Sequence, residues 1–444
     1  MAGAAYLDPT GLPSAYADLC REDTQTAPLA EDIQADHIVI GAGITGSSAA
    51  LHLAKAGHSV VQLEAGALSC GGSGRAFGLV VPYGKHGEAK ILRHFGAEQG
   101  AHHIDVLSQG PDLVRRLIAD HDIQGAKHGD GWVLAPHVQA SAEGLRKRAG
   151  YWQNRGADVE ILTGAALHET LGTDRYDMAM KDNRAFGINP YNYALGLARA
   201  ARDAGVRQFS NTPASRFHKT GDRWTVETPG GTVTANRLLV CTNAYAGSLS
   251  SRVTRSFVRV RGHQAVTEPL SDNVFASVLP GAGVVTDTRH TWSGIKKLPG
   301  NRLHLSAGGS TLTAQSGADL RSVINRLKEM YPQIADVGWQ SDWSGWVAMT
   351  PDQFARIQRL GDGAWAGFGH NGRGLAGATL MGRDMAHIAM ETPDHRPYVP
   401  VKDIRPLPFH AFGRYTAAAM IQWYRMTDAL ALRKELNAPR SPDR

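Results

Sequence analysis

The feature that most constrains the fold is a glycine-punctuated turn between two apolar runs near the start of the chain. Residues 36–66 read DHIVIGAGITGSSAALHLAKAGHSVVQLEAG, and Gly41, Gly43 and Gly46 stand in the order GxGxxG. A β-branched run stopped by glycine is typical of a buried parallel strand. The small residues that follow predict a helix whose N-terminal N–H groups suit phosphate oxygens. The pattern predicts a strand–helix–strand unit that binds a dinucleotide, and the alternative is the same unit in a purely structural role.

The acid at the end of the second predicted strand narrows the choice of nucleotide. Glu64 lies about 20 residues beyond the glycines, where a carboxylate can bind both hydroxyls of a ribose. Ile44 and Thr45 at the start of the helix and Ala65 beside the acid complete the expected contacts of this loop. No arginine adjoins Glu64, which argues against a ribose 2′-phosphate and hence against NADP. This pattern leaves both FAD and NAD open.

A second glycine cluster separates these two cofactors. Residues 68–82 read LSCGGSGRAFGLVVP, in which Gly71, Gly72, Gly74 and Gly78 leave little side-chain bulk. Such a loop can run along an extended diphosphate and reach an isoalloxazine ring, whereas the alternative is a flexible surface loop. Its position directly after the acid strand favours FAD.

With these two motifs the chain resembles the D-amino acid oxidase (DAO) superfamily of FAD-dependent amine oxidoreductases, and most closely its γ-glutamylputrescine oxidase-like branch. Members of the family have a glycine fingerprint near the N-terminus and then a loop that begins SGR, which Ser73, Gly74 and Arg75 match. Family loops often read SGRNGG, and Ala76 and Phe77 depart from that form.

The resemblance extends from about Gln34 to Leu430 and implies an α/β fold, α+β overall. It implies a Rossmann-like FAD-binding domain that is discontinuous in the sequence and an antiparallel-sheet substrate domain. We therefore expect an N-terminal extension at 1–32, a FAD-binding domain formed by 33–90, 185–250 and 340–392, a substrate domain formed by 91–184 and 251–339, and a C-terminal segment at 393–444.

Two further stretches match the family where its chain returns to the cofactor. The stretch TPA places the backbone of Ala214 against the adenine, by resemblance. The stretch LLVCTNAYA is similar to a family strand that ends beside the cofactor, which implies that Thr242 and Asn243 lie near FAD. The alternative is a plain buried strand with a polar end.

A third glycine cluster lies late in the chain. Residues 364–386 read AWAGFGHNGRGLAGATLMGRDMA, an aromatic strand followed by glycines and a small-residue helix. In the family, backbone N–H groups of this loop point at the pyrimidine edge of the flavin and stabilise the negative charge of reduced flavin. The resemblance carries this role to Gly369, Gly372, Arg373 and Gly374, and a tight helix-packing loop is the alternative.

The stretch HTWSGIKKLPG is the best candidate for contact with a substrate. Flavin amine oxidation needs little acid–base machinery, because hydride leaves the carbon beside the amine for flavin N5 and an imine forms. Family members place a basic residue about where Lys296 falls, either to bind a substrate carboxylate or to help reduced flavin meet oxygen. Lys297 is the fallback, since neighbouring strand residues face opposite sides, and Trp292 is expected as a pocket wall. Two solvated lysines before a turn are the alternative.

We expect the FAD to be held without a covalent bond. Some relatives attach flavin through a histidine in the loop after the first fingerprint, where this chain has Arg75. Others use a cysteine near the substrate sheet, whereas Cys20, Cys70 and Cys241 lie elsewhere in the sequence.

Composition fits a cytoplasmic enzyme. The 444 residues carry a net charge of +6 from scattered Lys and Arg, no CxxC pair and no long apolar run. We therefore expect no metal, no nucleic-acid partner and no membrane span. The expected activity is FAD-dependent oxidation of an amine or amino-acid C–N bond, with oxygen as acceptor and hydrogen peroxide as product. The alternatives are another electron acceptor, an NAD-dependent dehydrogenase and a flavin module that serves RNA modification, and the sequence leaves the amine and the oligomeric state open.

Overall fold

A parallel sheet is built around the first predicted strand. β1 (Ile33–Ile40) pairs in parallel with β2 (Val60–Leu63) and with β10 (Gly231–Val240), and β10 pairs in parallel with β17 (Ala364–Phe368). The apolar side chains of these strands share one buried core. Because the strands run in one direction, their carboxyl ends meet at one edge of the sheet, which is where a dinucleotide binds in such folds.

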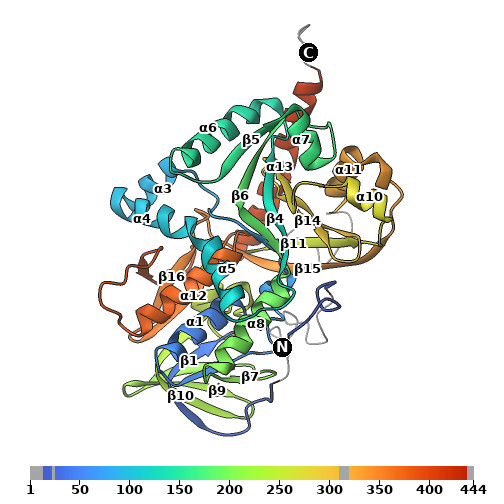
Figure 1. The fold of residues 1–444 in the computed structure, drawn as a ribbon. Coiled ribbons are helices and arrows are strands. Elements are labelled where there is room, and N and C mark those ends of the chain that lie inside the picture. Colours follow the sequence, from blue (N-terminus) through green and yellow to red (C-terminus); the bar gives the residue numbers. More distant parts are fainter. Residues whose placement is uncertain (1–13, 23–25, 310–319, 438–444) are drawn as a thin grey trace. The chain divides into compact units, whose positions relative to one another are not determined.

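The computed structural model describes residues 14–22, 26–309 and 320–437, which divide into two units (Figure 1). The first unit comprises the described residues up to Ala126, then Ile188–Arg259 and Gly345–Ala411. Its sheet has the order β18-β16-β17-β10-β1-β2-β7, with β9 paired to β10 and β8 to β9. The bounds of these further strands are β7 (Arg207–Phe209), β8 (Arg216–Thr220), β9 (Arg223–Thr228), β16 (Arg356–Gly361) and β18 (Val401–Asp403). The short strand β3 (Leu79–Val80) lies in the first unit's residues but does not belong to this sheet.

Helices of the first unit pack closely through small residues. Its helices are α1 (Ile44–Lys55), α2 (Gly72–Arg75), α3 (Glu88–Phe95), α4 (Ala97–Ser108), α5 (Gly110–Asp120), α8 (Pro190–Asp203), α9 (Ser251–Thr254) and α12 (Leu375–Ala389), with the 3₁₀ turn η3 (Asn243–Tyr245). α1 packs against α8 and α12. A Cβ on Gly382 of α12 would lie 2.3 Å from the Thr45 carbonyl oxygen, so only glycine permits this approach. α8 begins after Asn189, whose side chain caps the helix by accepting hydrogen bonds from the N–H groups of Tyr191 and Asn192.

The second unit contains a mostly antiparallel sheet. It comprises Lys127–Gly187, Val260–Ser344 and the described residues from Phe412 onward. Within its sheet the strand order is β15-β11-β14-β13-β12-β4-β6, with β5 paired to β6. The strands are β4 (Lys127–Ala135), β5 (Val159–Thr163), β6 (Met178–Ile188), β11 (Val258–Thr267), β12 (Val284–Asp287), β13 (Ser293–Leu298), β14 (Arg302–Gly308) and β15 (Trp339–Met349), and the ends of β6, β11 and β15 extend into the first unit's residues.

One face of this second sheet is apolar and covered by helices. Ile295, Leu303, Leu305 and Val285 pack there with Leu327 of α11. The remaining helical segments are α6 (Ala142–Gln153), α7 (Gly164–Leu171), α10 (Asp272–Ser277), α11 (Arg321–Met330) and α13 (His410–Leu436), with 3₁₀ turns η2 (Gln139–Ser141) and η5 (Pro332–Ile334). The alternation of a strand then directs Lys296 and His304 to the other face.

The units divide the chain differently from the expected domain ranges. The expected substrate-domain range 91–184 is split, because α4 and α5 belong to the first unit. A Cβ on Gly110 of α5 would lie 2.8 Å from the Cβ of Ala376, which shows how closely α5 approaches α12. The expected C-terminal segment 393–444 is also split, and its residues up to Ala411 belong to the first unit.

Candidate active site

The first glycine loop has no room for side chains. Gly41 adopts a φ of +105°, and a Cβ on Gly46 would lie 1.9 Å from the Gly41 carbonyl oxygen. A Cβ on Gly43 would lie 2.7 Å from the hydroxyl of Ser73. Ile44 and Thr45 open α1 directly after this loop. The backbone N–H groups here are therefore not screened by side chains, so a pyrophosphate can approach them closely.

Backbone N–H groups of the first glycine loop and of its own following residue hold the Glu64 side chain at the end of β2. Its carboxylate oxygens accept hydrogen bonds from the N–H of Ala42 at 2.8 Å and from the N–H of Ala65 at 2.9 Å. Burial raises the pKa of Glu64, and these backbone hydrogen bonds oppose the rise. The Glu64 carbonyl accepts from the N–H of Thr212 at 2.8 Å, which brings the segment that contains Ala214 to the same strand end.

The second glycine loop forms α2 and joins the first. The Ser73 hydroxyl accepts a hydrogen bond from the N–H of Ile44 at 3.0 Å. Gly72, Gly74 and Arg75 belong to the same short helix, and Arg75 Nε donates to the carbonyl of Cys70 at 2.9 Å. The first and the second glycine cluster are thus joined by a hydrogen bond and lie side by side.

The third glycine loop closes on the strand end that holds Thr242 and Asn243. Asn243 adopts a φ of +45°, and its side-chain oxygen accepts a hydrogen bond from the N–H of Gly369 at 3.1 Å. His370 in this loop lies 3.4 Å from the hydroxyl of Thr45, and burial lowers its pKa to about 4. The structure therefore brings all three glycine clusters together at the carboxyl edge of the parallel sheet.

Positive charge gathers where the third loop enters α12. Gly372 has a φ of +80° and Gly374 is the residue that precedes the helix. The Arg373 guanidinium donates to the Gly84 carbonyl at 3.0 Å, which places it beside Lys85 in the chain. Burial, and then the charge of Arg373, lowers the pKa of Lys85 to about 7. This end of the site suits an anionic group.

A flavin dinucleotide fits these residues. The Thr242 hydroxyl is buried and has no hydrogen-bond partner among the described residues, so it needs a partner that the chain does not provide. The bare loops at Gly43 and Gly46 admit a diphosphate, and Glu64 retains acceptor capacity for ribose hydroxyls.

The predicted substrate stretch forms β13 and separates its two lysines. Lys296 is fully buried, whereas Lys297 is half-buried and its Nζ lies 4.5 Å from the centre of the Phe275 ring. The interpretation of both as solvated lysines is wrong for Lys296, because the strand alternation turns its side chain inward. Burial holds the pKa of Lys296 well below its usual range.

Trp292 shares a sheet face with Lys296. It precedes β13, its carbonyl accepts from the N–H of Gly308 at 2.9 Å, and a Cβ on Gly308 would lie 3.2 Å from its ring. His290, two residues before Trp292, binds Asp428 of α13, with its Nδ1 2.7 Å from a carboxylate oxygen.

Sequence reasoning missed several polar residues of these two sites. His370 and Lys85 lie at the glycine loops, and His304 and Gln264 lie on the face of Lys296. His304 could have been found from the turn Pro299–Asn301, since an antiparallel hairpin about that turn sets residue 304 opposite residue 296.

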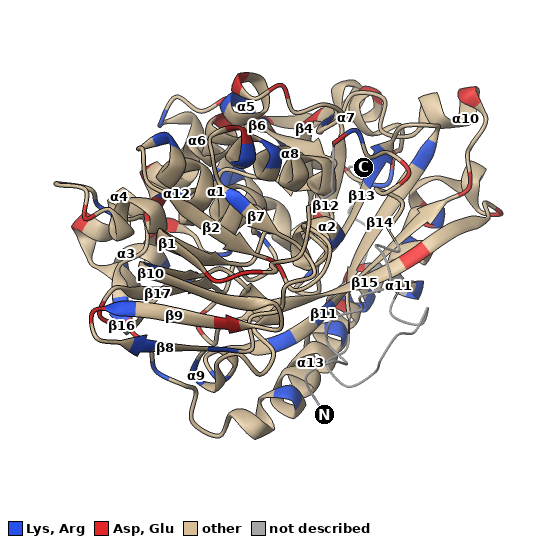
Figure 2. Ribbon diagram, turned by 90° about the horizontal axis from the view of Figure 1, so that it is seen from below, with Lys and Arg blue, Asp and Glu red and all other residues tan. Residues whose placement is uncertain are grey.

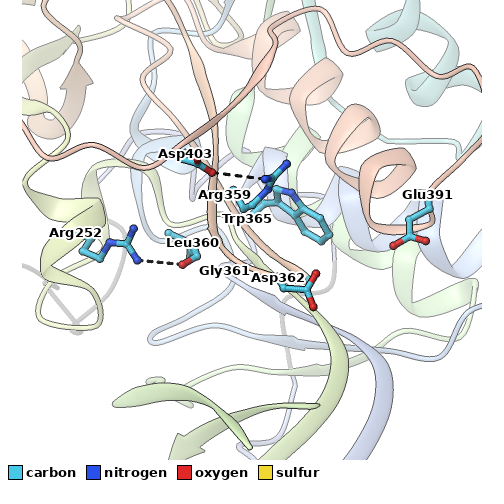
Figure 3. Close-up of a pocket in the computed structure, with 9 residues that line it drawn as sticks. Arg252, Arg359, Leu360, Gly361, Asp362, Trp365, Glu391 and Asp403 are labelled. Atoms are coloured by element: carbon cyan, nitrogen blue, oxygen red, sulfur yellow. Dashed lines mark hydrogen bonds and ion pairs between the residues drawn. The ribbon is translucent and has the colours of Figure 1, made fainter. Parts of the chain in front are cut away.

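A pocket of about 400 Å³ lies at the opposite edge of the first sheet, where β17 begins (Figure 3). The charged side chains that line this pocket form hydrogen bonds or ion pairs with other residues of the chain. Arg252 donates to the Leu360 carbonyl at 3.1 Å, and Arg359 lies 3.7 Å from Asp403. Asp362 and Glu391 pair with Lys219 and Arg237. Because these charges are paired and the glycine loops lie at the other edge, we do not assign substrate binding to this pocket.

Figure 2 shows Lys and Arg interspersed with Asp and Glu along the ribbon. Among the described residues, no helix combines the length and the apolar character needed to cross a bilayer.

The fold and its three joined loops define a flavin-type dinucleotide-binding protein. A family model described as FAD dependent oxidoreductase (DAO) matches residues 36–388. The chain belongs to this DAO family, and FAD is its cofactor.

Individual relatives agree with that assignment. The chain is 28% identical to gamma-glutamylputrescine oxidoreductase of Escherichia coli over 412 residues, which covers 90% of this chain and 96% of the relative. It is 28% identical over 384 residues to a probable oxidoreductase, OrdL, of Haemophilus influenzae, covering 85% and 88%. Among solved structures, glycine oxidase from Geobacillus kaustophilus has a TM-score of 0.69 at 21% identity, covering 84% of this chain and all 100% of that one. This last likeness shows the fold.

Proposed function

We propose that the chain oxidises the C–N bond of an amine or amino acid, with FAD as hydride acceptor. The observation that carries the proposal is the meeting of three glycine loops at one edge of the parallel sheet. An NAD-dependent dehydrogenase needs only the first of these loops. When bound, FAD takes hydride at N5 from the carbon beside the amine nitrogen, and the resulting imine is hydrolysed by water.

The first unit holds the cofactor in this proposal. N–H groups at the start of α1, from Ile44 onward, bind the pyrophosphate, and Glu64 binds the ribose. Thr242 and Asn243 lie beside the flavin, and the α12 entrance with Arg373 stabilises negative charge on its pyrimidine edge. The remaining proposed contacts are backbone atoms of Gly41, Gly43, Thr45, Gly46, Ala65, Gly72, Ser73, Gly74, Arg75, Ala214, Gly369, Gly372 and Gly374.

The second unit acts on the substrate in this proposal. Lys296 binds a charged group of the substrate or accepts its proton, and Lys297 is the second candidate for this role. Trp292 forms part of the wall of the substrate pocket. Full burial disfavours a permanent ammonium at Lys296. The side chain is therefore suited to a neutral resting state that gains charge when a proton or an anionic group arrives.

The names of the relatives support an amine or amino-acid substrate. Gamma-glutamylputrescine oxidoreductase and glycine oxidase both carry such a substrate in their names. We propose oxygen as the acceptor that restores the flavin, with hydrogen peroxide as product. A dehydrogenase that passes electrons to another acceptor is the second candidate, since a dimethylglycine dehydrogenase is also similar over 56% of this chain.

A spectrum and an anaerobic substrate screen test the proposal. The purified protein should be yellow, and an amine from a panel of amino acids, N-methyl amino acids and γ-glutamylated polyamines should bleach the flavin without oxygen. Air should restore the band and yield one hydrogen peroxide per turnover if oxygen is the acceptor. A yellow protein that no amine bleaches, but that NADH reduces rapidly, would overturn the assignment.

We further propose that the FAD is held non-covalently. Burial raises the pKa of the Cys70 and Cys241 thiols to about 12, so neither is a ready nucleophile. Acid precipitation should leave the flavin in the supernatant, and flavin in the pellet after washing would contradict this.

A further inference from the structure

The hairpin of β13 and β14 sets two buried titratable side chains opposite each other. Lys296 pairs with His304 across the two strands, and both are fully buried. Directly opposed residues of an antiparallel pair share a sheet face, with Cβ atoms about 4.5–5.5 Å apart. The two side chains are therefore immediate neighbours on the face opposite the apolar one that packs against α11.

A chain of hydrogen bonds orients His304. Its Nε2 lies 2.9 Å from the side-chain oxygen of Gln264 on β11, and the Gln264 amide nitrogen donates to the Ser306 hydroxyl at 3.1 Å. Trp343 stacks on the imidazole with ring centres 5.0 Å apart. Gln264 and Trp343 thus hold the ring directly, and Ser306 in turn holds the Gln264 amide.

These contacts determine which ring nitrogen carries the proton. An amide oxygen only accepts, so Nε2 of His304 must be the donor. The neutral imidazole then has its lone pair on Nδ1. Because the two ring nitrogens point away from each other, Nδ1 is directed away from Gln264 and β11.

We propose that His304 is a positioning residue for Lys296, holding its Nδ1 lone pair toward the lysine so that Lys296 can take the proton of a substrate ammonium. The inference rests on the proposed function. The step moves one proton: the substrate ammonium becomes a neutral amine and Lys296 becomes an ammonium that donates a hydrogen bond to Nδ1. Only the neutral amine can release hydride from the adjacent carbon, since an ammonium nitrogen has no lone pair to form the imine.

Among the described residues, His128 of β4 and Arg302 of β14 are titratable or charged groups near this pair. His128 of β4 and Lys296 both lower the pKa of His304 through their charge, after the larger effect of burial. Arg302 of β14 donates to the Pro299 carbonyl and to Gln340. The neighbours of the pair in the same row on β12 and β11 are Val284 and Val266, which carry no charge.

Two amide substitutions of His304 distinguish a role in positioning Lys296 from a role in folding alone. In His304→Asn the side-chain oxygen falls near the place of Nδ1, whereas in His304→Gln it reaches the place of Nε2. We expect the pH profile of anaerobic flavin reduction to be kept by His304→Asn and displaced by about one pH unit in His304→Gln. Gln264→Glu should make Nδ1 more basic and move the profile upward by a similar amount.

A measurement without turnover completes the test. Nitrogen-15 NMR of histidine-labelled protein should show the Nε2–H tautomer at His304 in the wild type, with or without added amine. An Nδ1–H tautomer overturns the proposal, as does a pH profile that Gln264→Glu and His304→Gln leave unmoved. Absence of bleaching by any amine in wild-type protein would instead overturn the proposed function itself.

Discussion

The candidate sites of the two units differ in the groups that form them: backbone atoms in the first unit and side chains in the second. In the first unit the proposed cofactor site is made mostly of backbone, at glycines where an added Cβ would strike a neighbour, as at Gly46, 1.9 Å from the Gly41 carbonyl oxygen. In the second unit the candidate site is made of buried side chains, above all Lys296 and His304 on one face of a sheet. Substitutions in the first should act on cofactor retention, and those in the second on the reaction of a cofactor that stays bound.

The largest effect should come from Gly46→Ala. The added methyl group overlaps the Gly41 carbonyl oxygen, so the loop must shift, at a cost of about 1–3 kcal/mol or more. The protein should purify colourless, with a lower melting temperature. Gly150→Ala in α6 is the control, because no atom lies within 4 Å of the new methyl group, and it should stay yellow. Full flavin content in Gly46→Ala would remove the basis for assigning the loop.

Glu64→Ala should weaken FAD binding with less damage to the fold. Loss of charge-assisted hydrogen bonds to the ribose costs about 1.5–3 kcal/mol, or roughly 10- to 100-fold in the dissociation constant. Titration of flavin-free protein by fluorescence quenching measures this, with Glu227→Ala on β9 as the control. Equal affinities in both variants would show that Glu64 only braces the loop through Ala42 and Ala65.

Lys296→Met should make the protein more stable. A fully buried amine, which folding must desolvate and deprotonate, is replaced by an apolar chain of similar length, a change that gains about 1–4 kcal/mol. The pKa of Lys296 is lowered in the folded state, so the unfolded chain binds more protons up to a pH of about 10.4, and wild-type stability rises with pH in that window. The gap between variant and wild type should narrow as pH rises. Denaturant unfolding at several pH values measures it, and a constant gap would contradict the burial of Lys296.

Asn189→Ala should have the smallest effect. It removes the side-chain oxygen that accepts from two N–H groups at the start of α8, which costs about 1 kcal/mol. The flavin spectrum should not change, because the helix start is not among the three glycine loops. Asn236→Ala on β10, where the side chain is exposed, should leave the melting temperature unaltered. A colourless Asn189→Ala protein would contradict this account, because it would mean that the start of α8 also contributes to FAD binding.

The same contrast explains what the sequence could predict. Glycine spacing reports directly on backbone geometry, so the strand–helix–strand unit and the meeting loops were foreseeable. The burial of Lys296 was not, because KK before a turn fits a solvated strand end equally well. His304 and Gln264 lie 40 residues apart on different strands, and only the strand register brings them together. Arg373 of the third loop donates to the Gly84 carbonyl, next to Lys85 in the chain, and no sequence pattern predicts this contact. The division of residues 91–184 between the units depends on helix packing at Gly110, which local periodicity does not reveal.

The most direct test of the account measures both half-reactions of Lys296→Met by stopped flow, with Lys297→Met as the matched control. The account predicts that both variants keep FAD, that Lys296→Met slows flavin reduction or reoxidation by on the order of 10- to 1000-fold, and that Lys297→Met stays within about twofold of wild type. If Lys296→Met reduces and reoxidises its flavin at wild-type rates, the buried lysine has no part in the chemistry, and the division of work between the two units is wrong.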